Sequence, residues 1–186
     1  MSAPKNFFAV LTVIFIAFFS TCQVAFANEE SDAHNIKGVQ IFNNAKSSQD
    51  YQNALKEYTA AIITDANDNN ISSYYSNRGS TQYKLGNYAA ALEDLNKALE
   101  LNGKNIFGYY WRAQVYEAQK NFDAAKEDWN STGNLDYSDG NYETAVQRYT
   151  SAIKIDDKNP EYYTNRGFAY YQLKNYEAAD KDYSIL

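Results

Sequence analysis

A pattern of aromatic and small residues repeats along this chain in units of 34 residues, and this repeat constrains the fold more than any other feature. Tyr75 and Gly79 open one unit, and Tyr163 and Gly167 open the last one at the same mutual offset. Self-similarity at a fixed period of this length predicts a solenoid, in which each unit buries its apolar face only against its neighbours. The class of function follows from this architecture, whereas the sequence does not identify the partner.

Apolar side chains within the units recur at helical spacing, with no alternating strand pattern. The clearest run is Tyr88, Ala91, Leu92, Leu95, Ala98 and Leu99. Helices of about a dozen residues joined by tight Gly-Asn or Lys-Asn turns form antiparallel hairpins, and a single hairpin cannot cover its own apolar stripe. We therefore predict an all-α chain of stacked hairpins.

The pattern resembles the tetratricopeptide repeat (TPR), a helical hairpin of 34 residues. The likeness lies in small residues where two helix axes approach and in aromatic residues packed against them. In one unit these residues are Tyr75, Gly79, Gly86, Tyr88, Ala91, Leu95 and Ala98. The resemblance implies a right-handed superhelical solenoid of antiparallel hairpins over residues 28–186. Its units are assigned to residues 35–71, 72–105, 106–139, 126–159 and 160–186.

Two of these units overlap, because Trp129 belongs to both patterns. About 14 residues that should close one helix and open the next are missing. We predict that residues 122–138 form one helix, which is the second helix of one unit and the first helix of the following one. A turn near Gly133 would contradict this prediction. Losing one helix should put the later hairpins out of phase, with a kink or a local change in the hand of packing.

Residues 1–27 are predicted to be a signal peptide. Lys5 supplies a short positive region, residues 7–19 are almost entirely apolar, and Ala27 ends an Ala-Phe-Ala sequence suited to a signal peptidase. We expect cleavage after Ala27 and export to the periplasm or the medium. An uncleaved membrane anchor is an alternative, since about 20 apolar residues suffice for a span. Lipidation at Cys22 is another.

The charges and the scarce reactive residues exclude several functions. The chain carries 17 Lys and Arg against 23 Asp and Glu, and the basic residues are scattered, which argues against nucleic acid. Cys22 is the only cysteine, and His34 is the only histidine. We expect the side chain of His34 to be exposed. Neither a catalytic triad nor a Gly-rich phosphate loop is present. We therefore predict no enzyme, no metal and no small-molecule cofactor.

A basic residue on the first helix and an acidic one on the second recur together in all units but one. The pairs are Lys37 with Glu57, Arg78 with Asp94, Arg112 with Asp128, and Arg166 with Asp182. In an antiparallel hairpin these charges lie at the same height, so we predict salt bridges rather than an anion site. Each should contribute about 0.5 to 1 kcal/mol at a partly exposed position. The irregular unit has Thr132 and Arg148 there and loses both partners.

The resemblance implies a concave groove lined by first helices. The residues at its groove positions are Tyr83, Phe107, Tyr110, Gln114, Asn130, Asn134, Tyr137, Thr164, Phe168 and Tyr171. Tyrosine rings supply rigid contact area and amides satisfy a peptide backbone, so this set suits an extended peptide. A stacking surface for sugars is the weaker alternative. The lysines with which some relatives grip a C-terminal carboxylate are replaced here by Ser76, Tyr110, Asn130 and Thr164.

The predicted last hairpin lacks a polar capping helix, so we expect Ala179, Tyr183 and Leu186 to lie on an incompletely covered face. Either the chain is a fragment of a longer array, or this face allows self-association. The sequence thus predicts an exported, non-enzymatic scaffold that binds a protein or peptide in its groove. The alternative is a structural module of an envelope complex whose terminal helices stack with other subunits.

Overall fold

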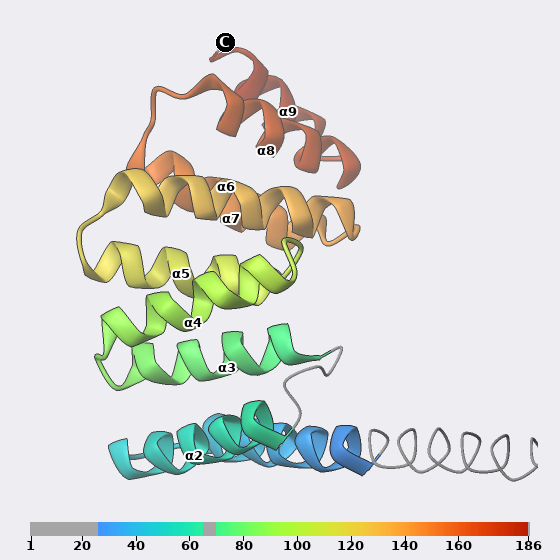
Figure 1. Cartoon of the computed structure of the whole chain (residues 1–186). Helices are drawn as coiled ribbons and strands as arrows, with labels where there is room; N and C mark the ends of the chain where they lie inside the picture. The colour runs from blue at the N-terminus through green and yellow to red at the C-terminus, as the bar shows by residue number, and fades with distance from the viewer. Residues whose placement is uncertain (1–25, 65–69, 186) are drawn as a thin grey trace, which may run out of the picture.

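The computed structural model describes residues 26–64 and 70–185, and within these ranges it contains helices and no strands (Figure 1). Most of the predicted signal peptide, and Leu186, lie outside the described residues. The first helix is described over residues 26–43. It is followed by α2 (Ser48–Thr64), α3 (Ile71–Lys84), α4 (Tyr88–Leu101), α5 (Ile106–Ala118), α6 (Phe122–Ser138), α7 (Tyr142–Ile155), α8 (Pro160–Gln172) and α9 (Tyr176–Tyr183). The predicted all-α superhelical array of hairpins is confirmed.

The turns inside the later hairpins share a local signal, a residue in the left-handed region followed by Asn. Gly86 and Gly140 adopt φ of 78° and 80°, and Lys120 and Lys174 both adopt 59°. A left-handed residue ends a helix because its backbone turns away from the helical path. The chain can then begin the next helix at once, which makes each hairpin tight and antiparallel.

Close helix approach inside a hairpin depends on glycine. A Cβ atom added to Gly133 would lie 2.6 Å from Cε1 of Tyr149, and one added to Gly167 would lie 2.5 Å from Cε1 of Tyr183. In the first hairpin the same relation joins Gly38 and Tyr58, at 2.7 Å. The glycine on the first helix therefore makes room for a ring on the second, as the repeat pattern predicts.

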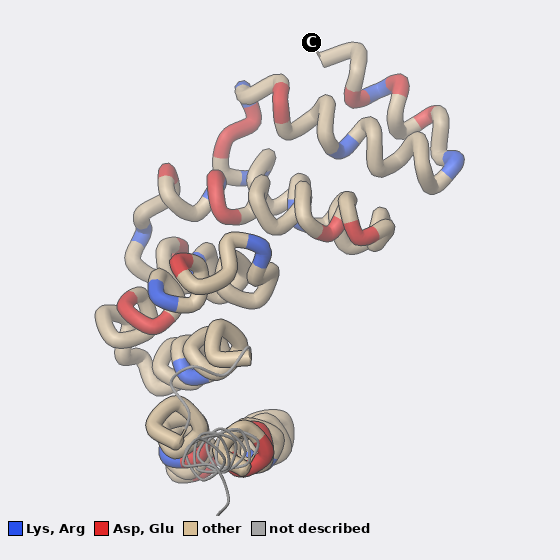
Figure 2. The backbone as a smooth tube through the Cα atoms, turned by 45° about the vertical axis from the view of Figure 1, so that its right-hand side comes forward, with Lys and Arg blue, Asp and Glu red and all other residues tan. Residues whose placement is uncertain are grey.

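The predicted interhelical charge pairs are formed. Each of three arginines donates two hydrogen bonds through Nε and Nη2 to both oxygens of its aspartate, at 2.7 to 2.8 Å. These pairs are Arg78 with Asp94, Arg112 with Asp128, and Arg166 with Asp182. The aspartates are buried, with 2% to 5% of their surface exposed, so the bridges are better shielded than predicted. Elsewhere Figure 2 shows Lys and Arg interspersed with Asp and Glu along the described chain.

A single uninterrupted helix, α6, spans Phe122–Ser138, so the predicted sharing of one helix by two units is confirmed. It has no turn at Gly133. Its buried residues lie on more than one face, because one face packs against α5 and another against α7 and α8. They are Ala125, Asp128, Trp129, Asn130, Thr132, Gly133 and Asp136.

The packing changes phase at α6. Before it, alternate helices α3 and α5 approach each other directly, whereas α4 and α6 do not. After it, α6 and α8 approach directly, whereas α7 and α9 do not. We call the alternate helices that contact each other directly the inner series. It consists of odd-numbered helices before α6 and of even-numbered helices from α6 onward.

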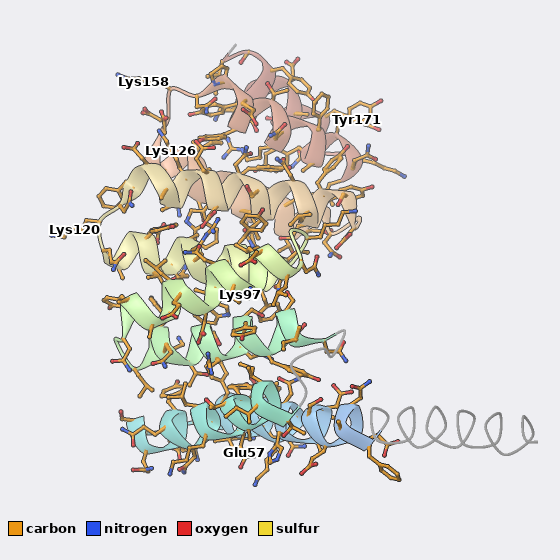
Figure 3. All side chains as sticks on the ribbon, in the orientation of Figure 1. Glu57, Lys97, Lys120, Lys126, Lys158 and Tyr171 are labelled. Atoms are coloured by element: carbon orange, nitrogen blue, oxygen red, sulfur yellow. The ribbon has the colours of Figure 1, made fainter. Side chains whose placement is uncertain are left out.

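The same change reverses the edges of the array. Lys120, in the turn inside the α5–α6 hairpin, lies at the same edge as Lys158, in the connection between α7 and α8 (Figure 3). Tyr171, close to the turn inside the α8–α9 hairpin, lies at the opposite edge. Turns inside the hairpins thus face opposite edges before and after α6.

The C-terminal hairpin corrects one expectation. Ala179 is only 2% exposed, and Tyr183 packs its ring beside Gly167 and edge-on to Phe168, with ring centroids 5.9 Å apart. These side chains fill the interior of the α8–α9 hairpin and do not form an open face. The exposed apolar residues of α9 and the segment that follows it are Tyr176 and Ile185 instead. Among the described residues, no helix combines the length and the apolar character needed to cross a membrane.

Candidate functional site

Four aromatic rings form a continuous row along α3, α5 and α6, which we call the aromatic row: Tyr83, Trp111, Tyr110 and Trp129. Successive ring centroids are 5.5, 5.2 and 5.4 Å apart. Rings at these separations attract one another beyond the area they bury, and they hold one another in place. Phe42 of the first helix extends the row, 6.3 Å from Trp111.

A cation lies at each end of the aromatic row. Nζ of Lys84 is 5.8 Å from the ring centroid of Tyr83 and 5.2 Å from that of Trp111. At the other end, Cζ of Arg148 is 5.8 Å from the centroid of Trp129 and 4.6 Å from that of Tyr110. The electron-rich face of each ring attracts the charge, and this attraction orients the flexible basic side chain. The row is therefore a rigid series of rings with positive ends, in which Tyr83, Trp111 and Tyr110 are partly exposed and Trp129 is buried.

The predicted groove residues fall into two sets. Tyr83, Tyr110 and Gln114 belong to α3 and α5, where Tyr83 and Tyr110 form part of the row, and Phe107 is 61% exposed beside them on α5. The other six belong to α6 and α8: Asn130, Asn134, Tyr137, Thr164, Phe168 and Tyr171. Because the inner series changes at α6, the two sets line different stretches of the array.

Part of the second set is occupied in holding helices together. Asn130 is buried, donates to Glu161 Oε1 at 2.9 Å and accepts from Asn165 at 3.1 Å. The Oδ1 atom of Asn134 accepts from Tyr149 Oη at 2.8 Å. These amides are committed to the α6–α8 and α6–α7 contacts, so they are less available to a peptide than their sequence positions imply.

The rest of the second set remains accessible. Phe168 and Tyr171 are 51% and 56% exposed. The Tyr171 ring lies edge-on to Tyr176, with centroids 5.3 Å apart, and Tyr137 makes the same contact with Tyr142. Thr164 donates its hydroxyl to the backbone of its own helix. This stretch offers isolated ring pairs instead of a continuous row.

A cleft of about 540 Å³ opens between α5 and α7, with Trp129 of α6 at its base. No Cα atom of α5 lies within 8 Å of one in α7, whereas α3 and α5 approach more closely than that. In the regular part of the array, the first helix of the next unit packs against the first helix before it, as α5 does against α3. Here α6 also serves as the first helix of the next unit, so no separate helix packs against α5 in that way. The cleft is lined by Tyr110, Gln114, Glu117, Trp129, Val146, Gln147, Arg148, Thr150, Ser151, Lys154 and Ile155.

Sequence reasoning missed Trp111 and the placement of Arg148. Trp111 precedes an arginine that pairs within its hairpin, and the repeat pattern assigns no ring to that position. Arg148 was recognised only as a lost salt bridge, yet its Nε lies 3.4 Å from Asp136 Oδ2 and its guanidinium covers Tyr110. The sequence does contain a signal for this placement, because Arg148 stands where the other units carry Asp or Glu.

Burial governs the ionisation of the carboxylates near the cleft. It raises the pKa of Asp136, and the positive charge of Arg148 opposes this shift only in part. Burial likewise raises the pKa of Asp128 against the opposing effect of Arg112. At the other end of the array, hydrogen bonds from Lys37 and then His34 lower the pKa of Glu57.

His34 differs from the expectation of a free, exposed side chain. Its Nδ1 lies 2.8 Å from Glu57 Oε2, and about a third of the side chain is exposed. Within the described part of the chain, no three His, Cys, Asp or Glu side chains are grouped so as to hold a metal ion.

Family models support this architecture. Models described as tetratricopeptide repeat match residues 72–105 and 108–128, and a model described as TPR repeat matches residues 133–174. The chain belongs to the tetratricopeptide-repeat family. The gap between the last two matches falls on the shared helix of this TPR protein.

Two curated relatives are similar over the repeats. Serine/threonine-protein phosphatase 5 of Rattus norvegicus is 34% identical over 106 residues, which are 57% of this chain and 21% of the phosphatase. Small glutamine-rich tetratricopeptide repeat-containing protein 2 of Saccharomyces cerevisiae is 32% identical over 104 residues, 56% of this chain and 30% of that protein. This TPR chain spans less than a third of the length of either relative.

A solved structure confirms the TPR fold. The TPR2B domain of yeast Sti1, described as a complex with pHsp70, superposes with a TM-score of 0.60 at 24% identity. The match covers 70% of this chain and 99% of that domain. The described repeats therefore share the fold of a TPR domain.

Proposed function

We propose that this TPR chain is a non-enzymatic scaffold that binds an extended peptide segment of a partner protein along the aromatic row. The observation that carries the proposal is the unbroken series of rings from Tyr83 to Trp129, with Lys84 and Arg148 at its ends. Rings that are already fixed by their neighbours lose little conformational entropy on binding, so their contact area contributes efficiently to affinity.

The surroundings of the row favour a peptide over a small ligand. The row crosses helices of successive hairpins, and exposed Phe107 continues its apolar surface on α5. Gln114 lies on the same helix and can pair with backbone amides of an extended segment. The TPR2B domain named above is described in a complex with pHsp70, which supports a protein ligand by analogy of fold.

Selection from a displayed library of random dodecapeptides on the full chain tests the proposal. The Tyr83→Ala and Phe107→Ala variants should bind the selected peptides about tenfold or more weakly than the wild type does, because truncating an aromatic residue of an interface commonly costs that much. Phe122→Ala is the matched control, since Phe122 is 51% exposed at the start of α6 away from the row. Equal binding by all variants, or the failure to select any peptide, would refute the proposal.

We further propose that the chain is exported and cleaved after Ala27. The apolar run of residues 7–19 and the small residues before Asn28 support this. Cleavage there would spare Asp32 and Asn35, which bond to Tyr74 and Asn77 of α3. Sequencing the N-terminus of the protein recovered from its native compartment tests the proposal; an intact Met1 or a lipid on Cys22 would contradict it.

A second function is favoured by the exposed apolar residues of α9 and its end. Tyr176 is 57% exposed and Ile185 is 49% exposed, so this end could stack with another subunit of an envelope complex. Under this alternative, partner capture depends on these two residues and survives Tyr83→Ala. Comparing Tyr176→Ser with Tyr83→Ala in one capture assay separates the two functions.

A further inference from the structure

The cleft between α5 and α7 differs chemically from the aromatic row that leads into it. Two cationic side chains, Arg148 and Lys154, line it, against one carboxylate, Glu117. Glu117 accepts a hydrogen bond from Trp129 Nε1 at 2.8 Å, which occupies one of its oxygens. The side chains that line the cleft thus carry one net positive charge in a chain whose net charge is −6, and Asp136, behind Arg148 and outside the lining, offsets part of it.

Arg148 is bonded differently from the other interhelical arginines. Arg78, Arg112 and Arg166 each use Nε and Nη2 in a two-fold contact with an aspartate. Arg148 makes one contact of 3.4 Å, from Nε to Asp136, and its Nη1 and Nη2 atoms hydrogen-bond to none of the described residues. One edge of this guanidinium thus keeps its full capacity to donate.

The position of Arg148 is fixed in advance of any ligand. Its guanidinium lies over Tyr110 at 4.6 Å and beside Trp129 at 5.8 Å, and the side chain is 24% exposed. A guanidinium edge with two parallel N–H groups matches the two oxygens of a carboxylate. A volume of 540 Å³ is within the usual range for a ligand site.

We infer that this cleft binds an acidic side chain, Asp or Glu, of the peptide that the aromatic row receives. The inference rests on the proposed peptide-binding function and names the chemistry of its partner. The carboxylate pairs with Nη1 and Nη2 of Arg148, and Lys154 of α7 adds a second positive charge to the lining. Tyr110 belongs to both the row and the cleft lining, so the two surfaces are continuous.

The test uses peptides selected on the full chain from the dodecapeptide library. Each is synthesised with its acidic residue and with the matching amide, Glu to Gln or Asp to Asn, and titrated calorimetrically. The acidic form should bind the wild type about tenfold or more tightly, as expected for a hydrogen-bonded charge. Arg148→Gln should abolish this difference, and Arg148→Lys should retain part of it. Lys97→Gln is the control for net charge and should behave as the wild type.

The outcomes separate this inference from the proposed function. If the peptides share no acidic residue, or if Arg148→Gln preserves the preference for the acid, the inference is overturned while peptide binding stands. If inorganic phosphate displaces the peptides as effectively as acetate does, the cleft is a general anion site and the inference is also overturned. If no peptide is selected, both proposals fail. Circular dichroism of Arg148→Gln and Arg148→Lys establishes that both variants are folded.

Discussion

The α3–α4 hairpin and the α5–α6–α7 segment are built from the same repeat pattern, but their interhelical arginines are bonded differently. In the hairpin, Arg78 holds both oxygens of a buried Asp94 at 2.7 to 2.8 Å. In the segment, Arg148 holds Asp136 by one contact of 3.4 Å and stacks on Tyr110. The regular pair is used within its hairpin, whereas the irregular arginine reaches a neighbouring unit. The two side chains are about equally exposed, at 24% for Arg148 and 22% for Arg78, so the loss of one helix changes the hydrogen bonding of the arginine and leaves one edge of its guanidinium unpaired among the described residues.

The two regions also differ in how tightly their helices are enclosed. Helix α4 buries one stripe, of Ala91, Asp94, Leu95 and Ala98. Helix α6 is packed by α5 on one side and by α7 and α8 on others, so its buried residues surround more of the helix. A change that forces α6 to move therefore disturbs several contacts, whereas α4 has an exposed side toward which it can relax.

The largest expected difference concerns the two glycines at equivalent places. Gly133→Ala should lower the free energy of unfolding by about 3 kcal/mol, because its Cβ would meet the buried ring of Tyr149 at 2.6 Å. Gly79→Ala should cost less, about 1 to 2 kcal/mol, because its Cβ would meet Cγ of the buried Leu95 at 2.7 Å and the backbone oxygen of Ala91 at 3.2 Å, and an aliphatic side chain can change rotamer where a ring cannot. Gly103→Ala, with no neighbour closer than 3.9 Å, is the control. Urea denaturation measures all three, and equal losses at Gly79 and Gly133 would contradict the comparison.

The next largest effects on the free energy of unfolding are expected at the interhelical charge pairs. Asp94→Asn should cost about 2 kcal/mol, less than for a fully buried pair because Arg78 is 22% exposed and partly screened. Asp136→Asn should cost less than about 1 kcal/mol, since its single contact is long and burial already disfavours its charge. Thermal and urea unfolding check both values. A loss at Asp136 as large as that at Asp94 would mean that Arg148 is held as firmly as the regular arginines.

A pH series should give smaller effects of opposite sign in two regions. Asp136 has a raised pKa in the folded state, so that state binds the proton more tightly than the unfolded chain. The stability of the wild type relative to Asp136→Asn should rise as the pH falls from 7 through the raised pKa toward 3.8. Glu57 has a lowered pKa, so the stability of the wild type relative to Glu57→Gln should fall as the pH drops below 4.5.

Parallel pH profiles for the two pairs would contradict the opposite environments assigned to Asp136 and Glu57. The measurement is urea denaturation at each pH, with each variant compared to the wild type in the same buffer. The amide substitutions keep the size of the side chain, so the comparison isolates the charge.

The smallest expected effect lies at a helix start. Asn121→Ala should cost about 0.5 kcal/mol, because its exposed side chain accepts from Ala124 N at a long 3.4 Å. Asn141→Ala is the matched control, since Asn141 precedes α7 in the same kind of turn and makes no capping bond. Equal losses in urea denaturation would show that the bond at Asn121 contributes nothing to the stability of α6.

The repeat pattern predicted the fold because the same local rules operate in each hairpin. Gly133 and Tyr149, or Arg112 and Asp128, meet wherever two such helices pair, so their spacing in sequence sets their contact in space. The shared helix α6 was predictable for the same reason, because one sequence satisfies two overlapping patterns.

The candidate site was predicted less completely, because it depends on contacts between units. Tyr83 and Tyr110 were found from their groove positions, but Trp111 joins them only through packing across two hairpins. Asn130 has a groove position and is buried against α8, because the phase change brings that helix onto it. The cleft arises where a helix is absent, and no single residue pattern encodes a missing neighbour.

The switch of the inner series at α6 limits the length of any ligand that lies across these helices. Three helices, the first, α3 and α5, form the inner series on the N-terminal side. At interaxial distances of 8 to 10 Å, their span is roughly 20 Å. A fully extended chain covers this distance with about six residues. A longer partner would have to bend at α7 or leave the array there, so recognition should be confined to a short linear motif.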